Sequence, residues 1–456
     1  MFVSASQPAR FIDWRGSRPN EEFEIVQSWG RTHRAAQDCQ RPFLLNEATA
    51  ELARQSTRST LPYGCGRSYG DVCLNAGGRL LMTERLNRII YADWARGVVR
   101  AESGLTLAEL LQLTVPRGWF PYVTPGTKFV TLGGLVANDV HGKNHEIHGT
   151  FGCHVTNIGL ARSDGGTLTL SPVENSDLFA ATIGGLGLTG LITWVEIKLQ
   201  PIASAFVEVE SIKLASLDDF FRIAEQHSEW PYQVGWVDCL AKGRNVGRGV
   251  YIRGRHSTSG GFAVHGNARL GVLFDPPFSI LNRSSVRLFN TFYRNRPWIF
   301  GPPQRIHYDP FFYPLDQLSE WPRLYGRHGF FQHQSVTPLA QAYDVTRSLL
   351  ALTAEHGEGS FLVVLKLFGD KRSPGILSFP MPGVTLALDF PNRGENTRRL
   401  LRGMADLVVA AGGRLYPAKD ATMSAQAFRT GFPDWRKLEA LRDPKIMSDF
   451  WRRVTT

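Results

Sequence analysis

The chain has 456 residues, of which 43% are hydrophobic and 11% aromatic, so it is long enough to bury a large core in two or three domains. A net charge of +10 favours an acidic partner, but the 51 Lys and Arg residues are spread along the chain and form no nucleic-acid-binding signature, which argues against that class. No apolar run approaches the roughly eighteen residues of a membrane-spanning helix and residues 1–22 lack a signal pattern, so we expect a cytoplasmic protein with at most peripheral contact at the inner membrane face.

The part of the chain between residues 64 and 190 has the pattern of a mixed α+β region with glycine-rich turns. Two helix signals interrupt it, one at residues 106–118 with Thr106 as N-cap and one at residues 176–185 with Ser176 as N-cap. The five cysteines are scattered without a Cys-x-x-Cys pair, so we expect reduced thiols and not a disulfide framework.

From about residue 204 the pattern changes to strand-like runs separated by helices. Strands are expected at residues 205–215, 232–241, 248–255, 330–338, 360–369 and 383–391, and helices at residues 217–230, 340–357 and 396–413. This order predicts a second, antiparallel sheet covered by helices. Residues 276–308 carry five arginines and no acidic residue, and they form either an amphipathic helix packed on the core or a basic surface for anionic lipid. Its apolar helical face is expected at Leu281, Leu288, Phe289, Phe292 and Tyr293.

The segment GGLGLTG contains a Gly-x-Gly-x-x-Gly pattern at Gly185, Gly187 and Gly190. A dinucleotide-binding fingerprint needs a strand before these glycines and a helix after them. Here a helix-like run precedes and a strand-like run follows, so a Rossmann NAD site is not expected. Two interpretations remain: a tight helix-to-strand turn, or glycines that let bare backbone approach a flat ligand.

Residues 136–155 (VANDVHGKNHEIHGTFGCHV) hold four of the twelve histidines and raise the question of a metal site. His141 and His145 are four residues apart, but the Glu of a His-Glu-x-x-His motif is absent and no carboxylate cluster stands nearby, so no metal is expected. His141 differs from the others because it ends an apolar run and enters a Gly-Lys-Asn turn. Its side chain is expected to lie against a buried ligand.

The segments PYGCGRSYGD, PGTKFVTLGGLVANDVHGKNH and GGLGLTGLI together resemble the flavin-binding segments of the vanillyl-alcohol oxidase and p-cresol methylhydroxylase superfamily. With FYPLDQLSEW, LKLFG, LSFPMPG and GGRLYPAKD, the chain is similar to the decaprenylphosphoryl-β-D-ribose 2′-oxidase family from about residue 60 to residue 430. The resemblance implies an α+β fold of two domains. Residues 1–203 and 414–456 would form an FAD-binding domain, and residues 204–413 an inserted substrate-binding domain with an antiparallel sheet.

The resemblance also implies which residues bind FAD. They are Pro62, Tyr63, Gly64, Cys65, Gly66, Arg67, Ser68, Tyr69, Gly70, Asp71, Val72, Gly126, Thr131, Leu132, Gly133, Gly134, Asn138, Asp139, Val140, His141, Ile192 and Tyr416. Members of the superfamily that attach FAD covalently use a histidine in the first glycine loop, at the place where this chain has Arg67. FAD is therefore expected to be non-covalent.

Oxidising a secondary alcohol requires hydride transfer to the flavin, removal of the hydroxyl proton and positive charge beside the reduced flavin. Lys366 stands out on physical grounds because it interrupts an apolar run, where an unpaired lysine is costly. With the resemblance, the expected catalytic residues are Lys419, His141, Gln334, Lys366 and Tyr313, and the expected substrate residues are Lys143, Gln332 and Phe368. The proton acceptor stays open between His141, Lys419 and solvent.

The reaction implied by the resemblance is FAD-dependent oxidation of the 2′-hydroxyl of a polyprenyl-phosphoryl-β-D-ribose to the 2′-keto sugar. It is the first half of an epimerisation to the arabinose form, used for cell-wall arabinan, and a separate NAD(P)H-dependent short-chain reductase is the expected partner. The alternative is an aldonolactone or alditol FAD oxidase acting on a soluble polyol. Arg67 and the segment YPAKD argue against this alternative. A third hypothesis, a flavin-free protein that binds lipid phosphates, would have no need of the glycine clusters.

Overall fold

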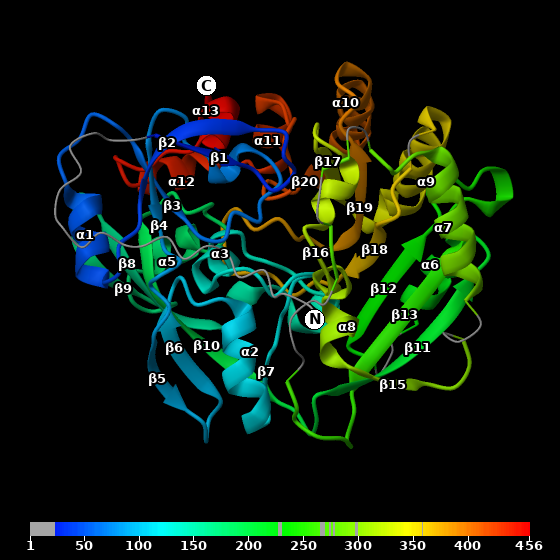
Figure 1. Cartoon of the computed structure of the whole chain (residues 1–456), viewed down its shortest axis with the longest axis horizontal. Helices are drawn as coiled ribbons and strands as arrows, with labels where there is room; N and C mark the ends of the chain where they lie inside the picture. The colour runs from blue at the N-terminus through cyan, green and yellow to red at the C-terminus, as the bar shows by residue number, and fades with distance from the viewer. Residues whose placement is uncertain are drawn as a thin grey trace, which may run out of the picture.

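The computed structural model describes residues 23–226, 230–264, 270–272, 275–276, 279–296, 300–357 and 359–456. Within them, three large β-sheets and one short parallel pair are surrounded by helices (Figure 1). Residues 1–22, the end of the predicted helix at 227–229, and parts of the basic segment at 277–278 and 297–299 lie outside the described residues. No helix of the described residues is both long and apolar enough to cross a membrane.

The first sheet has the strand order β1-β2-β4-β3. Strands β2 and β3 both pair with β4 in parallel, whereas β1 pairs with β2 in the antiparallel sense. All four residues of β4 are buried, as expected for a central strand covered on both faces. The strands are β1 Glu24–Gln27, β2 Arg34–Gln40, β3 Thr60–Tyr63 and β4 Arg79–Met82.

The second sheet is antiparallel, with the strand order β5-β6-β10-β8-β9 and β7 paired to the end of β10. Its strands are β5 Ile89–Asp93, β6 Val98–Glu102, β7 Trp119–Pro121, β8 Val155–Arg162, β9 Gly166–Leu170 and β10 Leu191–Pro201. The helices of this half of the chain are α1 Leu45–Ala53, α2 Leu107–Thr114, α3 Leu132–Ala137, α4 His145–His148 and α5 Ser176–Thr182.

The third sheet has eight antiparallel strands in the order β15-β11-β13-β12-β18-β19-β17-β20. They are β11 Phe206–Leu214, β12 Tyr232–Val237, β13 Gly249–His256, β15 Gln304–His307, β17 Phe330–Thr337, β18 Val363–Phe368, β19 Gly383–Pro391 and β20 Arg414–Leu415. The parallel pair is β14 Leu270–Gly271 with β16 Leu318–Ser319. The predicted second antiparallel sheet is confirmed.

Helices α6, α9 and α10 cover one face of the eight-stranded sheet, as the sequence predicts (Figure 1). Leu365, Leu386 and Leu388 point toward these helices and belong to the largest buried core. The remaining helices are α6 Leu217–Ala224, α7 Arg283–Asn295, α8 Tyr308–Phe312, α9 Leu339–His356, α10 Glu395–Ala410, α11 Ala425–Gly431, α12 Trp435–Leu441 and α13 Asp449–Thr455.

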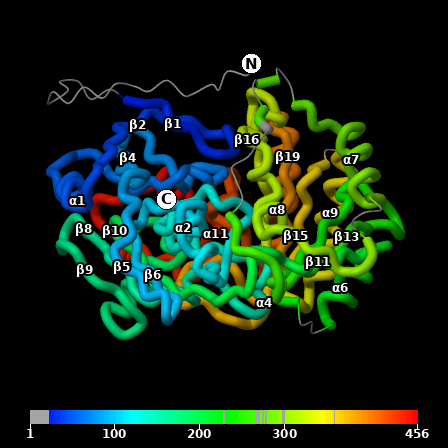
Figure 2. Tube along the Cα trace, turned by 60° about the horizontal axis from the view of Figure 1, so that its bottom comes forward, coloured from blue at the N-terminus to red at the C-terminus, as the bar shows by residue number. Residues whose placement is uncertain are grey.

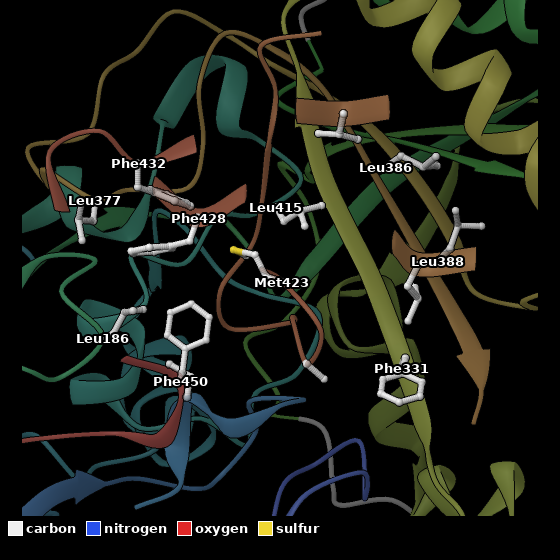
Figure 3. Packing of buried hydrophobic residues seen from close by; sticks show 14 of the residues in the cluster. Leu186, Phe331, Leu377, Leu386, Leu388, Leu415, Met423, Phe428, Phe432 and Phe450 are labelled. Atoms are coloured by element: carbon white, nitrogen blue, oxygen red, sulfur yellow. The ribbon is translucent and has the colours of Figure 1, made fainter. Parts of the chain in front are cut away.

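The C-terminal segment leaves the eight-stranded sheet after β20 and packs against the first sheet. Thr60 at the start of β3 pairs with Ile446, and α13 lies beside residues 71–73. In Figures 1 and 2 the red helices of this segment accordingly lie beside the blue N-terminal strands. Figure 3 shows Phe428 and Phe450 of α11 and α13 packed near Leu186 of the third glycine cluster. The two ends of the chain therefore share one core.

The helix starts test the capping predictions. Thr106 caps α2, because its side chain accepts from the Glu109 backbone N–H, as predicted. The prediction of Ser176 as a cap is wrong: Ser176 is the first helical residue, and Asn175, with φ of 50°, occupies the N-cap position. Helix α5 precedes GGLGLTG and β10 follows it, the reverse of the Rossmann order.

Helix α7 corrects the prediction for the basic segment. Its expected single apolar face is divided: Phe289 and Tyr293 pack on the ring of Trp236, whereas Leu288 and Phe292 are 74% and 59% exposed. Residues spaced by three or four share a face of a helix, and here Val286 and Asn290 continue the buried face. The helix therefore packs on the protein and still leaves apolar side chains on its surface.

Candidate active site

A cavity of about 930 Å³ is lined by all three glycine clusters, by the face of the eight-stranded sheet that the helices do not cover, and by Tyr416, Ala418 and Lys419. Most of the predicted site residues line it, namely Pro62, Tyr63, Gly64, Cys65, Gly66, Arg67, Ser68, Tyr69, Val72, Gly126, Thr131, Gly133, Gly134, Asn138, Val140, His141, Lys143, Ile192, Gln332, Gln334, Lys366, Tyr416 and Lys419. Residues that are distant in sequence thus converge on one space. Six predicted residues lie behind its wall, namely Gly70, Asp71, Leu132, Asp139, Tyr313 and Phe368.

One side of the cavity has bare backbone. A Cβ atom added to Gly126 or Gly187 would meet no atom within 4 Å, so both glycines present open backbone to the space that they line. Gly66 has φ of 60°, a conformation that glycine adopts without strain, and a Cβ there would collide with the Tyr63 hydroxyl. Gly126 and Gly187 therefore leave room for a flat ligand to lie directly on the backbone, and for Gly187 this agrees with the second of the two interpretations of GGLGLTG.

Three buried polar atoms in the cavity wall have no hydrogen-bond partner among the described residues: Ser103 Oγ, Asn138 Oδ1 and Thr385 Oγ1. Buried polar groups are normally paired, so such atoms in the wall of a cavity indicate a ligand that pairs them. Ser103 and Asn138 stand on the glycine-rich side, and Thr385 stands on β19 of the eight-stranded sheet. The site therefore fits a ligand that has polar groups on both sides.

The first glycine loop is fixed from behind by the C-terminal segment. Arg453 donates to both carboxylate oxygens of Asp71, at 2.8 and 2.7 Å, and to Asp420 at 3.1 Å. Gly70 packs so closely on the Asp420 backbone that a Cβ would overlap its carbonyl oxygen. Gly70 and Asp71 thus hold the loop that lines the cavity and do not themselves face it.

His141 is the centre of a buried polar group. Its Nδ1 is 3.2 Å from Lys366 Nζ, and its Nε2 is 2.9 Å from the side-chain amide of Gln334. The amide N–H of Gln334 donates to Nε2, so the neutral His141 ring carries its proton on Nδ1 and can donate it to the Lys366 amine when that amine is neutral. Burial and the adjacent Lys366 hold the pKa of His141 well below its ordinary value, which keeps the ring neutral.

Three lysines face the same space, and burial lowers the pKa of each. The pKa of Lys366 falls to about 7 through burial and the charges of Lys143 and Lys419, and those of Lys143 and Lys419 fall to about 8. Lys143 donates to the carbonyl oxygens of Phe311 and Phe312 at 3.0 and 3.2 Å. The Lys419 ammonium group lies 4.0 Å from the Tyr69 ring centroid and makes no hydrogen bond to the described part of the chain. Such a cluster favours an anionic ligand.

Strand alternation decides which predicted residues reach the cavity. Successive residues of a strand point to opposite faces, so Gln332 and Gln334 on β17 face the cavity while His333 between them bonds Ser335 on the helix-covered side. On β19 the same rule turns Thr385 and Ala387 inward.

Asp389 shares that inward register and was missed from the sequence, together with Thr385 and Ser103. Its side chain accepts from Gln332 Nε2 at 2.5 Å, and burial raises its pKa to about 7. The alternation of Thr385, Ala387 and Asp389 with two leucines in TLALDFP was the signal that would have identified this inward row.

Two residues predicted to act on substrate are supports behind the wall. Tyr313 is fully buried and its hydroxyl lies 2.6 Å from Thr124 Oγ1, and Thr124 in turn lines the cavity. The Phe368 ring lies edge-on to His141, with centroids 4.8 Å apart. The other histidines of residues 136–155 also lie outside the cavity lining, and the described residues contain no cluster of three or more His, Cys, Asp or Glu side chains able to hold a metal ion.

The comparisons with known proteins agree with this geometry. The FAD binding domain family model matches residues 47–171, which include the first two glycine clusters. Decaprenylphosphoryl-beta-D-ribose oxidase of Mycolicibacterium smegmatis is 33% identical over 94% of this chain and 97% of its own length. A putative D-arabinono-1,4-lactone oxidase of Neurospora crassa is 28% identical over 35% of this chain and 28% of its own length. Mouse L-gulonolactone oxidase is 25% identical over 44% and 46%, respectively.

The polar atoms and bare glycines of the cavity fit FAD, and the match to the ribose oxidase extends over nearly all of both chains. The lactone oxidases match less than half of the chain. The chain therefore belongs to the decaprenylphosphoryl-β-D-ribose oxidase family and is an FAD-dependent oxidoreductase, a flavoprotein with an α+β fold that acts on a CH–OH group.

Proposed function

We propose that this protein oxidises the 2′-hydroxyl of a polyprenyl-phosphoryl-β-D-ribose to the ketone. The observation that carries the proposal is the cluster of Lys143, Lys366 and Lys419 in the same cavity as the bare glycines, because a phosphoryl sugar brings the negative charge that these three lysines lack. The 2′-keto product would then pass to a separate NAD(P)H-dependent reductase, which completes the epimerisation. A neutral polyol would leave the lysine cluster uncompensated.

FAD, when bound, supplies the hydride acceptor for the carbinol carbon. We assign Lys366 as the group that accepts the hydroxyl proton. Its pKa of about 7 means that about half of the molecules carry a neutral amine there near neutral pH. His141 is a poor acceptor, because its pKa is lowered well below the ordinary value. Lys419 keeps a positive charge beside the reacting atoms, and Gln334 and Thr385 orient the sugar hydroxyls.

We further propose that FAD is bound without a covalent bond and that the chain divides as the family pattern implies, with residues 204–413 inserted between two parts of an FAD-binding domain. Arg67 supports the first point: it stacks 3.9 Å from the Trp29 ring centroid and donates to the Phe129 carbonyl. The packing of α13 against residues 71–73 supports the second, with β20 as the last strand before the chain returns.

Changing Gly126 to valine is expected to weaken the binding of FAD without changing the stability of the fold. The added side chain enters open cavity space and meets no protein atom at its Cβ, so FAD binding should weaken by at least about tenfold while the apoprotein keeps its melting temperature. Flavin content of the purified variant and a thermal melt measure the two effects. Gly165→Val, at an exposed turn with the same open surroundings, is the control and should retain FAD.

The pH dependence of kcat/KM is expected to be bell-shaped. Below a pKa of about 7 Lys366 is an ammonium group that cannot accept a proton, so activity rises with pH up to that point; above about 8 Lys419 loses its charge, so activity falls. Lys366→Arg keeps the charge but cannot deprotonate, so activity should drop about 10²-fold and the rising limb should disappear. Lys371→Arg, outside the cavity, should keep the wild-type profile. A rising limb that persists in Lys366→Arg contradicts the assignment.

The proposed function is tested with the purified holoenzyme and synthetic farnesyl-phosphoryl-β-D-ribose. Reduction of the bound flavin on mixing, with formation of the 2′-ketone, is the expected result, and the arabinose epimer and a soluble lactone such as L-gulono-1,4-lactone should leave the flavin oxidised. Acid precipitation should release FAD into the supernatant. Rapid reduction by the lactone but not by the lipid-linked ribose would show that the polyol alternative is correct.

A further inference from the structure

The cavity extends past the lysines across the inner face of the eight-stranded sheet. Strand registers place four of its lining residues in one row: Gln334 pairs with Ala387, Ala387 with Val364, and Val364 with Trp236. Two residues along β12 a second row of lining residues begins, since Val234 pairs with Ile252 and Ile252 with Ser211. All of these residues line the cavity.

The chemistry of this face changes from one end to the other. On β17 and β18 it presents Gln332, Gln334 and Lys366, next to His141. From Val364 of β18 across β12, β13 and β11 it presents the apolar corridor, which we define as Val209, Ser211, Val234, Trp236, Ile252 and Val364 and in which Ser211 is the one polar side chain. An apolar wall that continues a charged pocket fits a ligand with a charged head and a hydrocarbon tail.

The corridor is covered on its other side. Tyr293 of α7 lies with its ring centroid 4.5 Å from that of Trp236 and also lines the cavity, as do Leu315 and Leu318. The indole N–H of Trp236 donates to the Phe361 carbonyl at 2.9 Å, so it is not available to a ligand. A sugar or a polar chain in this space would give up hydrogen bonds to water and find few in return.

We propose that the corridor binds the first isoprene units of the polyprenyl chain, with the phosphoryl ribose held by the lysines; this rests on the proposed function. The hydrocarbon begins at the phosphate, so it must leave the lysine cluster along a neighbouring surface, and this apolar face adjoins it. Crossing from β18 to β11 spans three strand spacings, about 14 Å. The corridor therefore contacts the first few isoprene units and leaves the rest of a long chain outside.

The test measures kcat/KM of the holoenzyme for phosphoryl-ribose esters of geranyl, farnesyl, geranylgeranyl and longer chains at one fixed detergent concentration. For the wild type, kcat/KM should rise by at least about tenfold from geranyl to geranylgeranyl and then level off. Ser211→Trp places an indole at the β11 end of the corridor, so it should remove the gain in kcat/KM with chain length and lower kcat/KM least for the shortest ester. Lys213→Trp is the matched control, two residues along β11 on the same face and outside the cavity lining, and should behave as wild type.

Binding of the prenyl monophosphates, followed by the change in the flavin spectrum, gives a readout that does not depend on turnover. If no ester is oxidised but affinity still rises with chain length and Ser211→Trp removes that rise, the proposed function fails and the corridor stands. If neither affinity nor kcat/KM depends on chain length in the wild type, or if Ser211→Trp weakens all chain lengths equally, the corridor proposal is wrong. Ile252→Trp, on the paired strand, should repeat the result if Ser211→Trp does not fold.

Discussion

Replacing Lys419 by methionine is expected to lower kcat by about 10³-fold while FAD remains bound. The ammonium group lies in the cavity over the Tyr69 ring, where burial lowers its pKa to about 8 and the buried carboxylate of Asp389 opposes that shift. Methionine keeps the length and apolar stem of lysine, so the packing on Tyr69 persists and the charge alone is lost. Single-turnover flavin reduction measures the chemical step directly.

Lys437→Met is the matched control, because this lysine of the same C-terminal segment is exposed and pairs with Asp434 at the surface. It should retain wild-type kcat. Flavin content and the visible flavin spectrum must be equal in both variants for the comparison to hold. A Lys419→Met enzyme with a reduction rate within a factor of about three of the wild type would remove Lys419 from the reaction.

Replacing Arg453 by alanine is expected to lower the free energy of unfolding by about 3 kcal/mol and to weaken FAD binding at the same time. The change leaves the buried carboxylates of Asp71 and Asp420, which are 6% and 7% exposed, without their shared cation. The two effects are coupled because Asp71 closes the first glycine loop, whose neighbours line the cavity. Denaturant unfolding of the apoprotein and FAD titration measure them separately.

Arg436→Ala provides the control, since this exposed arginine of α12 stacks on the Trp435 ring and makes no contact with the glycine loop. Its removal should change stability by less than about 0.5 kcal/mol. If Arg453→Ala destabilises the protein but binds FAD as tightly as the wild type, the C-terminal segment serves the fold alone. If Arg453→Ala and the wild type are equally stable, the free energy gained from the ion pairs of Arg453 only equals the free energy that their desolvation costs.

The sequence failed to predict some local structure for identifiable reasons. Helix α3 was not expected, because two of its six residues are glycines, which are poor helix formers; the Thr131 cap and tertiary packing override that preference. Asn175, and not Ser176, is the N-cap residue of α5, because the αL backbone of Asn175 lets the chain turn one residue earlier. For α7, the composition alone did not show which apolar side chains face the protein.

By itself the sequence determined the second antiparallel sheet and its covering helices, since these depend on period-2 alternation and helix caps, which are local properties of the chain. The class of the protein and the glycine segments around the cofactor followed from the resemblance of its motifs to a known family. Tertiary structure alone decided how the site is assembled. It brought Lys366 and Gln334 to His141 and put Tyr313 and Phe368 behind the wall. These contacts join residues about two hundred positions apart, and they depend on strand register and packing, which no local pattern encodes.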